Sequence, residues 1–163
     1  MLKTNNELES EFMKDNYSWD SYSTEELIEL TKKTNPMIYK QLINNGIANK
    51  ALTPMEFYSL CYEYRNAIIY GISDSIKIDY SLLSHNEIAD ILKTLSVEIP
   101  AFEALLKEYE ETNNHNIKES RKSIYNDCKA DIKKMKCHII KINQELKRRV
   151  FDSQQQSQPG EEE

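Results

Sequence analysis

The most regular hydrophobic pattern of the chain lies between residues 114 and 150. Apolar side chains recur there in steps of three and four residues, and neither Gly nor Pro interrupts them. This spacing places the apolar positions on one stripe of an α-helix, as in helices that pack against another helix. The pattern predicts a long helix over 113–151 with an apolar seam. The seam consists of Ile124, Cys128, Ile132, Met135, Ile139, Ile142 and Leu146.

The seam requires a partner helix, and two partners fit the pattern. At about 1.5 Å per residue the helix spans roughly 55 Å, which is longer than a small domain can cover. One partner is the preceding helix of the same chain, in an antiparallel helical hairpin. The other is a second copy of the chain, in a coiled coil. We therefore expect the seam to be a helix-packing or oligomer interface and part of the helix to project.

Four shorter helices are predicted ahead of the long one by their start and stop signals. A Ser, Thr or Asn that can cap free backbone amides opens each helix, and in three cases a Glu follows three residues later. Two of the helices end near a glycine, a residue that adopts the left-handed conformation found at helix ends. The starts are Ser23, Asn35, Thr53 and Ser84, and the stops are Gly46 and Gly71.

Two segments leave alternatives open. Residues 72–83 alternate apolar and polar positions like a β-strand, but no second strand is predicted to pair with them. We interpret them as an extended connector, with a strand paired across an oligomer and a helix start as alternatives.

Pro100 is expected to end or kink the helix after Ser84. The Asn-rich residues 112–116 favour a hairpin turn over a continuous helix, because Asn side chains compete for helical hydrogen bonds.

These elements predict an all-α protein in which a small helical domain precedes a long basic helix. Residues 1–22 are expected to be a flexible acidic segment, 23–112 the helical domain, 113–151 the long helix and 152–163 a disordered acidic tail. Only three of the 163 residues are glycine, which argues against phosphate-cradling loops and all-β folds.

Charge is unevenly distributed along the chain. The formal net charge is −6, yet residues 121–150 contain ten Lys or Arg against three acids. Residues 1–30 contain two Lys against eight acids, and the last thirteen residues carry four acids and no base. Segregated charge of this kind indicates association between oppositely charged surfaces, within a chain or between chains.

The expected location is the cytoplasm. The three cysteines are odd in number and lack a CxxC spacing, which is typical of reduced thiols. No apolar stretch approaches the roughly 20 residues of a membrane span, and the N-terminus lacks the apolar region of a secretory signal. We expect no membrane partner.

Catalytic and metal motifs are not evident in the sequence. His85, His115 and His138 are far apart, and none has a second ligand at helical spacing. No serine lies in a nucleophile elbow, and each cysteine lies on or beside an apolar stripe. We therefore expect a non-enzymatic protein with no cofactor, no metal and no small-molecule substrate.

Basic side chains of the long helix lie mostly off the seam, where they could contact phosphates or an acidic partner. Further lysines lie near the second predicted helix. The candidate contacts are Lys133, Lys134, Lys141, Lys147, Arg148 and Arg149, with Lys32, Lys33 and Lys40.

Residues 24–46 resemble, in outline, the helix–turn–helix of phage repressor-type regulators. The resemblance covers about 25 residues and implies that Lys40, Gln41, Asn44 and Asn45 face DNA. The sequence departs from the motif at the turn, which lacks a glycine, and at Pro36, which opens the supposed recognition helix.

Two functions follow from these patterns. The first is a non-enzymatic interaction protein, an adaptor, inhibitor or assembly factor that binds another protein or a second copy of itself. The composition of the chain, rich in Lys, Asn and Ile, is similar to that of small phage or plasmid accessory proteins. The second is a regulator that dimerises through its C-terminal helix and binds double-stranded DNA.

Overall fold

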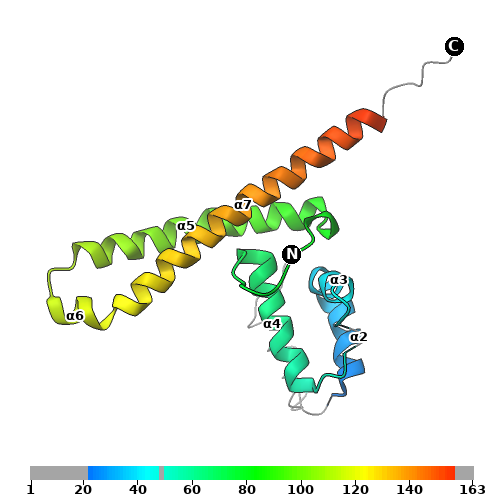
Figure 1. Ribbon diagram of the computed structural model, residues 1–163, viewed down its shortest axis with the longest axis horizontal. Coiled ribbons are helices and arrows are strands. Elements are labelled where there is room, and N and C mark those ends of the chain that lie inside the picture. The colour runs from blue at the N-terminus through cyan, green and yellow to red at the C-terminus, as the bar shows by residue number, and fades with distance from the viewer. Residues whose placement is uncertain (1–21, 48–49, 157–163) are drawn as a thin grey trace.

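The computed structural model describes residues 22–47 and 50–156, and within them every regular element is a helix (Figure 1). The all-α prediction is confirmed. The elements are α2 (Thr24–Thr34), α3 (Pro36–Asn44), α4 (Pro54–Tyr70), the short 3-10 helix η3 (Tyr80–Leu82), α5 (His85–Glu111), α6 (His115–Ser120) and α7 (Lys122–Gln156). The predicted flexible segment, residues 1–22, lies outside the described residues except for Tyr22.

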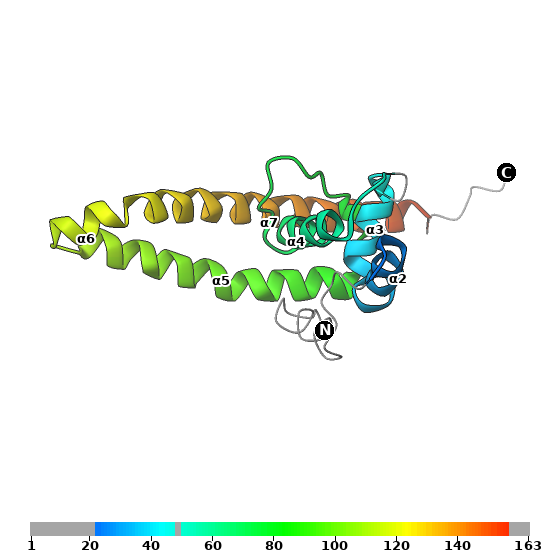
Figure 2. The same cartoon turned by 90° about the horizontal axis from the view of Figure 1, so that it is seen from below.

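The shape is a helical hairpin with a small helical group at one end. Helices α5 and α7 run antiparallel side by side, and α6 lies at their far turn (Figures 1 and 2). Helices α2, α3 and α4 gather at the opposite end and contact one another and the hairpin. No helix in the described part of the chain is long and apolar enough to cross a membrane.

The predicted start and stop signals form as expected. Thr53 and Ser84 each accept a hydrogen bond from the backbone amide of the Glu three residues later, and that Glu side chain accepts one in return. Ser23 caps α2 through the Glu26 amide. Gly71 ends α4 in the left-handed conformation, with φ 67°. Local side-chain chemistry therefore sets most helix ends.

The long basic region differs from the prediction in two respects. It is divided at Arg121 into α6 and α7, and near this break the Tyr109 hydroxyl donates at 2.9 Å to the Lys118 carbonyl. The helix also continues to Gln156, so the prediction of disorder is wrong for 152–156. Residues 157–163 lie outside the described part.

Residues 112–114 form a turn between α5 and α6, as the sequence predicted in preference to a continuous helix. Helix α5 ends at Glu111, and Asn114 caps α6 by accepting from the amides of Asn116 and Ile117. Pro100 does not end α5, which continues through it.

A single hydrophobic core joins the small helical group to the hairpin. Its buried members come from α2, α3, α4, α5 and α7, including Leu27, Ile68, Ile91 and Met135. The middle of α7, from Ile132 to Ile142, thus completes the core of the preceding helices. The predicted boundary near residue 112 does not separate two cores.

The segment before α5 is a connector, as predicted, and contains no strand. Side chains from distant elements hold its backbone. The Gln41 amide donates to the Asp79 carbonyl at 2.8 Å and accepts from the Asp79 amide at 3.0 Å. Arg149 donates to the carbonyls of Tyr80 at 3.0 Å and Leu83 at 2.6 Å. These bonds replace those that a neighbouring strand would have made.

Candidate interaction surface

The seam of α7 faces α5 of the same chain, which forms the largest interhelical contact. Three seam residues, Ile132, Met135 and Ile142, are buried. Three others, Cys128, Ile139 and Leu146, are half-buried and pack against the core. Ile124 is 69% exposed. Within one chain the seam is therefore a hairpin interface along most of its length, and it is open at Ile124.

The open end of the seam borders an apolar groove. Three large aliphatic side chains, Leu105, Ile117 and Ile124, line this groove and are respectively 57%, 41% and 69% exposed. The groove has a volume of about 320 Å³ and lies between α5, α6 and the start of α7. Tyr109 and Tyr125 stack beside it with ring centroids 4.3 Å apart. We call this feature the tip groove, because it lies at the end of the hairpin remote from α2–α4 (Figure 2).

Charged side chains surround the tip groove, and Glu108 and Arg121 line it. The acidic α5 side has Glu103, Glu108, Glu110 and Glu111 against Lys107. The basic α6–α7 side has Lys118, Arg121, Lys122 and Lys129 against Glu119 and Asp127. Some of these charges are used within the hairpin, since Glu110 accepts from the Tyr125 hydroxyl at 2.9 Å and Glu103 pairs with Lys136 at 2.8 Å.

The predicted basic contacts fall into two groups. Four are held within the protein: Lys40 by Glu87, Lys134 by Asp74, Arg148 by Glu145 and Asp152, and Arg149 by Glu145 and the connector. The other five are exposed and form no ion pair with a described residue: Lys32, Lys33, Lys133, Lys141 and Lys147.

The helix–turn–helix outline has little free polar surface. Helices α2 and α3 are separated by Asn35 alone. The expectation that Gln41 faces outward is wrong, because Gln41 is 0% exposed and bonded to Asp79. Asn45 donates to the Tyr64 hydroxyl at 2.8 Å, and Lys40 donates to the Leu82 carbonyl at 2.8 Å. These polar groups of α3 and its C-terminus are used to hold neighbouring elements.

The contact between α7 and the connector contains two buried polar groups that the sequence reading did not identify. His138 is 2% exposed; its Nε2 lies 2.8 Å from the Ile68 carbonyl and its Nδ1 lies 2.8 Å from the Tyr80 hydroxyl. Glu145 is 9% exposed. Hydrogen bonds from Arg148, and to a smaller extent from Arg149, lower its pKa to about 2. Glu145 could have been recognised as the only acid between Asp131 and Asp152 in a basic helix.

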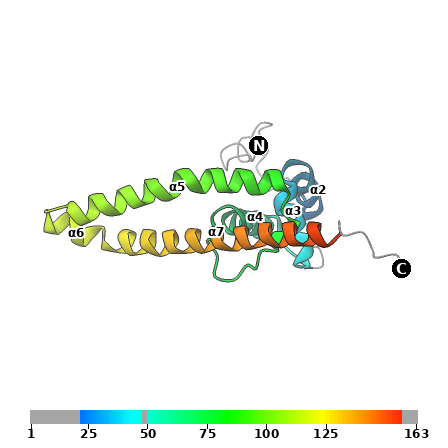
Figure 3. The ribbon, with the colours of Figure 1, turned by 90° about the horizontal axis from the view of Figure 1, so that it is seen from above.

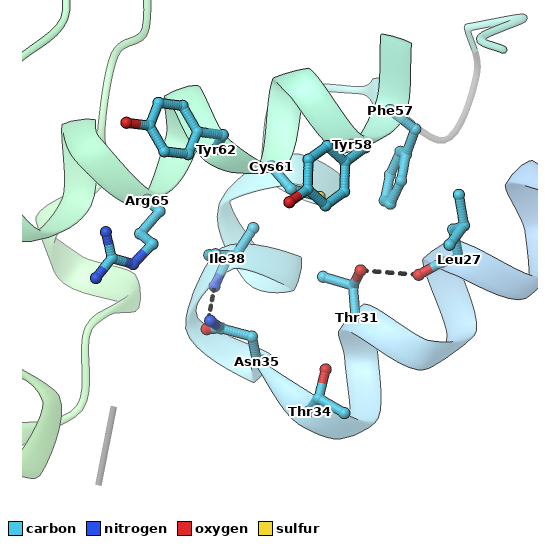
Figure 4. A pocket seen from close by; sticks show the side chains of 10 residues that line it. All are labelled: Leu27, Thr31, Thr34, Asn35, Ile38, Phe57, Tyr58, Cys61, Tyr62 and Arg65. Carbon is cyan, nitrogen blue, oxygen red and sulfur yellow. Dashed lines mark hydrogen bonds between the residues drawn. The ribbon is translucent and has the colours of Figure 1, made fainter. Parts of the chain in front are cut away.

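A small pocket lies between α2, α3 and α4 (Figure 4). Its volume is about 40 Å³, well below the roughly 300–1,000 Å³ that is usual for small-molecule sites. Burial raises the pKa of the Cys61 thiol to about 12, which keeps this lining residue protonated and unreactive. Arg65 lies at the edge, and its buried Nε has no hydrogen-bond partner. The pocket has room for water but not for a substrate.

Groups of His, Cys, Asp or Glu able to hold a metal ion are not found among the described residues. No family model matches the chain, and neither the curated proteins nor the solved structures contain a match.

Proposed function

We propose that the protein is a non-enzymatic interaction module, an adaptor, inhibitor or assembly factor, that binds a protein partner through the tip groove. The observation that carries the proposal is the exposure of Leu105, Ile117 and Ile124 around one groove. Contiguous exposed apolar side chains with a polar rim are typical of protein interaction sites.

The flanking charges favour a second copy of the chain as one such partner. In a twofold-symmetric contact the same patch serves on both subunits. The acidic α5 side of one hairpin would then oppose the basic α6–α7 side of the other. Burial of Ile124 in such a contact would extend the seam to its full predicted length.

Light scattering of purified protein tests self-association, and a pull-down from the native host tests for another partner. We expect Leu105→Glu combined with Ile124→Glu to abolish the association while leaving the helical circular dichroism unchanged, because both side chains are exposed. Val97→Glu is the matched control, since Val97 is 66% exposed on α5 away from the groove. The proposal would be refuted if the protein were a monomer in light scattering and also captured no partner in the pull-down. It would also be refuted if the association survived the double substitution.

A DNA-binding regulator is the second candidate, and the outer face of α7 favours it. Lys122, Lys129 and Lys147 recur there at helical spacing, are exposed and have no ion pair with a described residue. A mobility-shift assay with duplex DNA at low and high salt tests it, because phosphate contacts weaken steeply with salt. Absence of a shift at low salt would exclude this candidate.

A further inference from the structure

The ribbon of the connector stands away from α7 (Figures 2 and 3). Side chains of the connector and of α7 line a cleft together. Two adjoining hollows of about 580 and 400 Å³ share the lining residues Gly71, Ser73, Tyr80 and Lys141. Each is within the range of roughly 300–1,000 Å³ that is usual for small-molecule sites. We call this feature the connector cleft. It is separate from the tip groove and shares no lining residue with it.

The connector cleft carries an excess of positive charge. Five cationic side chains line it: Lys77 from the connector and Lys133, Lys134, Lys141 and Arg148 from α7. The lining contains one carboxylate, Glu145, and that group is already bound by Arg148 and Arg149.

Three of these cations have no partner of their own. Lys77, Lys133 and Lys141 are exposed and form no ion pair with any residue that the structure describes. Lys77 and Lys141 line the same hollow from opposite elements, the connector and α7. An anion between them would be contacted from both sides, at lower dielectric than on an open surface.

The walls of the cleft are fixed before any ligand arrives. The Tyr80 hydroxyl is bonded to His138, and Arg149 holds the Tyr80 carbonyl at 3.0 Å. Gly71 lies so close to His138 that a Cβ on Gly71 would be 2.5 Å from the Cβ of His138. Prior ordering of this kind lowers the entropy lost when a ligand binds.

Apolar groups complete the lining. Ala67, Ile76 and Ile78 border the larger hollow beside the aromatic ring of Tyr80. The cleft thus combines unpaired ammonium groups with an apolar wall. A molecule with a phosphate and a flat ring system matches both: the phosphate is complementary to the ammonium groups, and the ring is complementary to the apolar wall.

We propose that the connector cleft binds a small phosphate-bearing molecule with a flat apolar group, the chemistry of a nucleotide. The phosphates lie between Lys77 and Lys141, and the flat group lies against Ile76, Ile78 and Tyr80. A nucleic-acid backbone fits less well, because a connector that lies over part of the helix would obstruct a duplex. The lysines suited to a duplex lie instead on the outer face of α7.

Isothermal titration of the full chain with ATP, and separately with inorganic pyrophosphate, tests the site. We expect ATP to bind more tightly than pyrophosphate, and Lys77→Gln and Lys141→Gln each to weaken ATP binding by about tenfold or more, as expected for loss of a charged hydrogen bond. Lys129→Gln is the matched control: it removes the same charge from an exposed, unpaired position of α7 outside the cleft. Its affinity for ATP should be unchanged.

The ring of His138 gives an independent signal, because it lines the smaller hollow together with Lys141. Its NMR resonances should move on addition of ATP in the wild type and in Lys129→Gln, whereas Lys141→Gln should need about tenfold more ATP for the same movement.

Four results would overturn the proposal. The first is that neither ATP nor pyrophosphate gives a heat of binding or moves the His138 resonances. The second is that all three substitutions weaken ATP binding equally, and the third is that pyrophosphate binds as tightly as ATP. The fourth is that the protein binds duplex DNA and neither small molecule. All three lysines are exposed and unpaired, so thermal unfolding of each variant should match the wild type and exclude misfolding as the cause.

Discussion

At the residue scale, the bonds of His138 determine its protonation. The Ile68 carbonyl can only accept, so Nε2 carries the hydrogen and Nδ1 accepts from the Tyr80 hydroxyl. Burial lowers the pKa of His138 below its ordinary value of 6.5, and the nearby charge of Lys141 lowers it further, against the Ile68 bond, which raises it. The buried imidazole is therefore neutral at neutral pH.

This protonation state makes the stability of the protein depend on pH. Below about pH 6.5 the unfolded chain binds a proton at residue 138 that the folded chain does not, so the free energy of unfolding falls as pH decreases towards the folded pKa. The His138 contribution is at most about 1.4 kcal/mol per pH unit. Urea unfolding between about pH 7.5 and 5.5 measures the slope. His138→Gln should reduce it, and an equal slope in the variant would contradict the assignment.

Gly71 is a second residue whose surroundings permit a sharp prediction. It has φ +67°, and an added Cβ would be 2.5 Å from His138. Gly71→Ala should lower the free energy of unfolding by about 3 kcal/mol, combining left-handed strain with steric overlap. Gly46→Ala is the control, since Gly46 has φ +73° with no atom within 4 Å of its added Cβ. That change should cost only about 1 kcal/mol in urea titrations. Equal losses would contradict the close contact.

At the scale of elements, α7 is a packing helix for most of its length and an open helix near its start. Met135 is 0% exposed against the core, whereas Ile124 is 69% exposed at the tip. Both positions belong to the same predicted seam, so the sequence pattern does not distinguish them. The difference arises because the core around Met135 also contains residues of α2, α3 and α4, whereas the groove at Ile124 is lined only by residues between 102 and 128.

Two substitutions separate these two parts of the seam. Met135→Ala should lower the free energy of unfolding by about 2–5 kcal/mol, because it leaves a cavity in the core. Ile124→Ala should change it by no more than about 0.5 kcal/mol in dilute, monomeric protein. Chemical denaturation followed by circular dichroism measures both. A large effect at Ile124 that depends on protein concentration would show that a second copy covers it.

The sequence predicted the features that depend on near neighbours. The caps at Thr53 and Ser84, the stop at Gly71 and the period of the seam are local patterns, and all appear in the structure. The break at Arg121 was missed, because residues 117–125 contain no Gly or Pro that would signal it. The burial of Gln41 was missed because its hydrogen-bond partner, Asp79, is 38 residues away along the chain.

At the scale of the whole molecule, the shared core makes the hairpin part of the folding unit. Ile132, Met135 and Ile142 of α7 belong to the same buried cluster as Leu27 and Phe57. Arg149 also holds the connector through two carbonyls. A small helical group without α7 would expose that cluster and leave the connector partly unbonded.

A truncated chain ending at residue 121 should therefore fail to fold. We expect its circular dichroism to show much less helix than residues 1–121 contribute in the full chain, and its thermal unfolding to lose cooperativity. The control is truncation after residue 156, which leaves every helix of the described part intact. A cooperative transition in the shorter chain would show that the preceding helices fold independently.

The distribution of buried residues also has a consequence for hydrogen exchange. Ile99 is the last buried residue of α5 and Ile132 the first of α7, and none of residues 100–131 between them is buried. The amides of that arm should exchange through local fraying, at rates that small amounts of urea barely change. Amides of 88–99 and 132–146 should exchange only when the whole molecule opens. The far half of the hairpin would then melt and re-form many times during the lifetime of a single folded core.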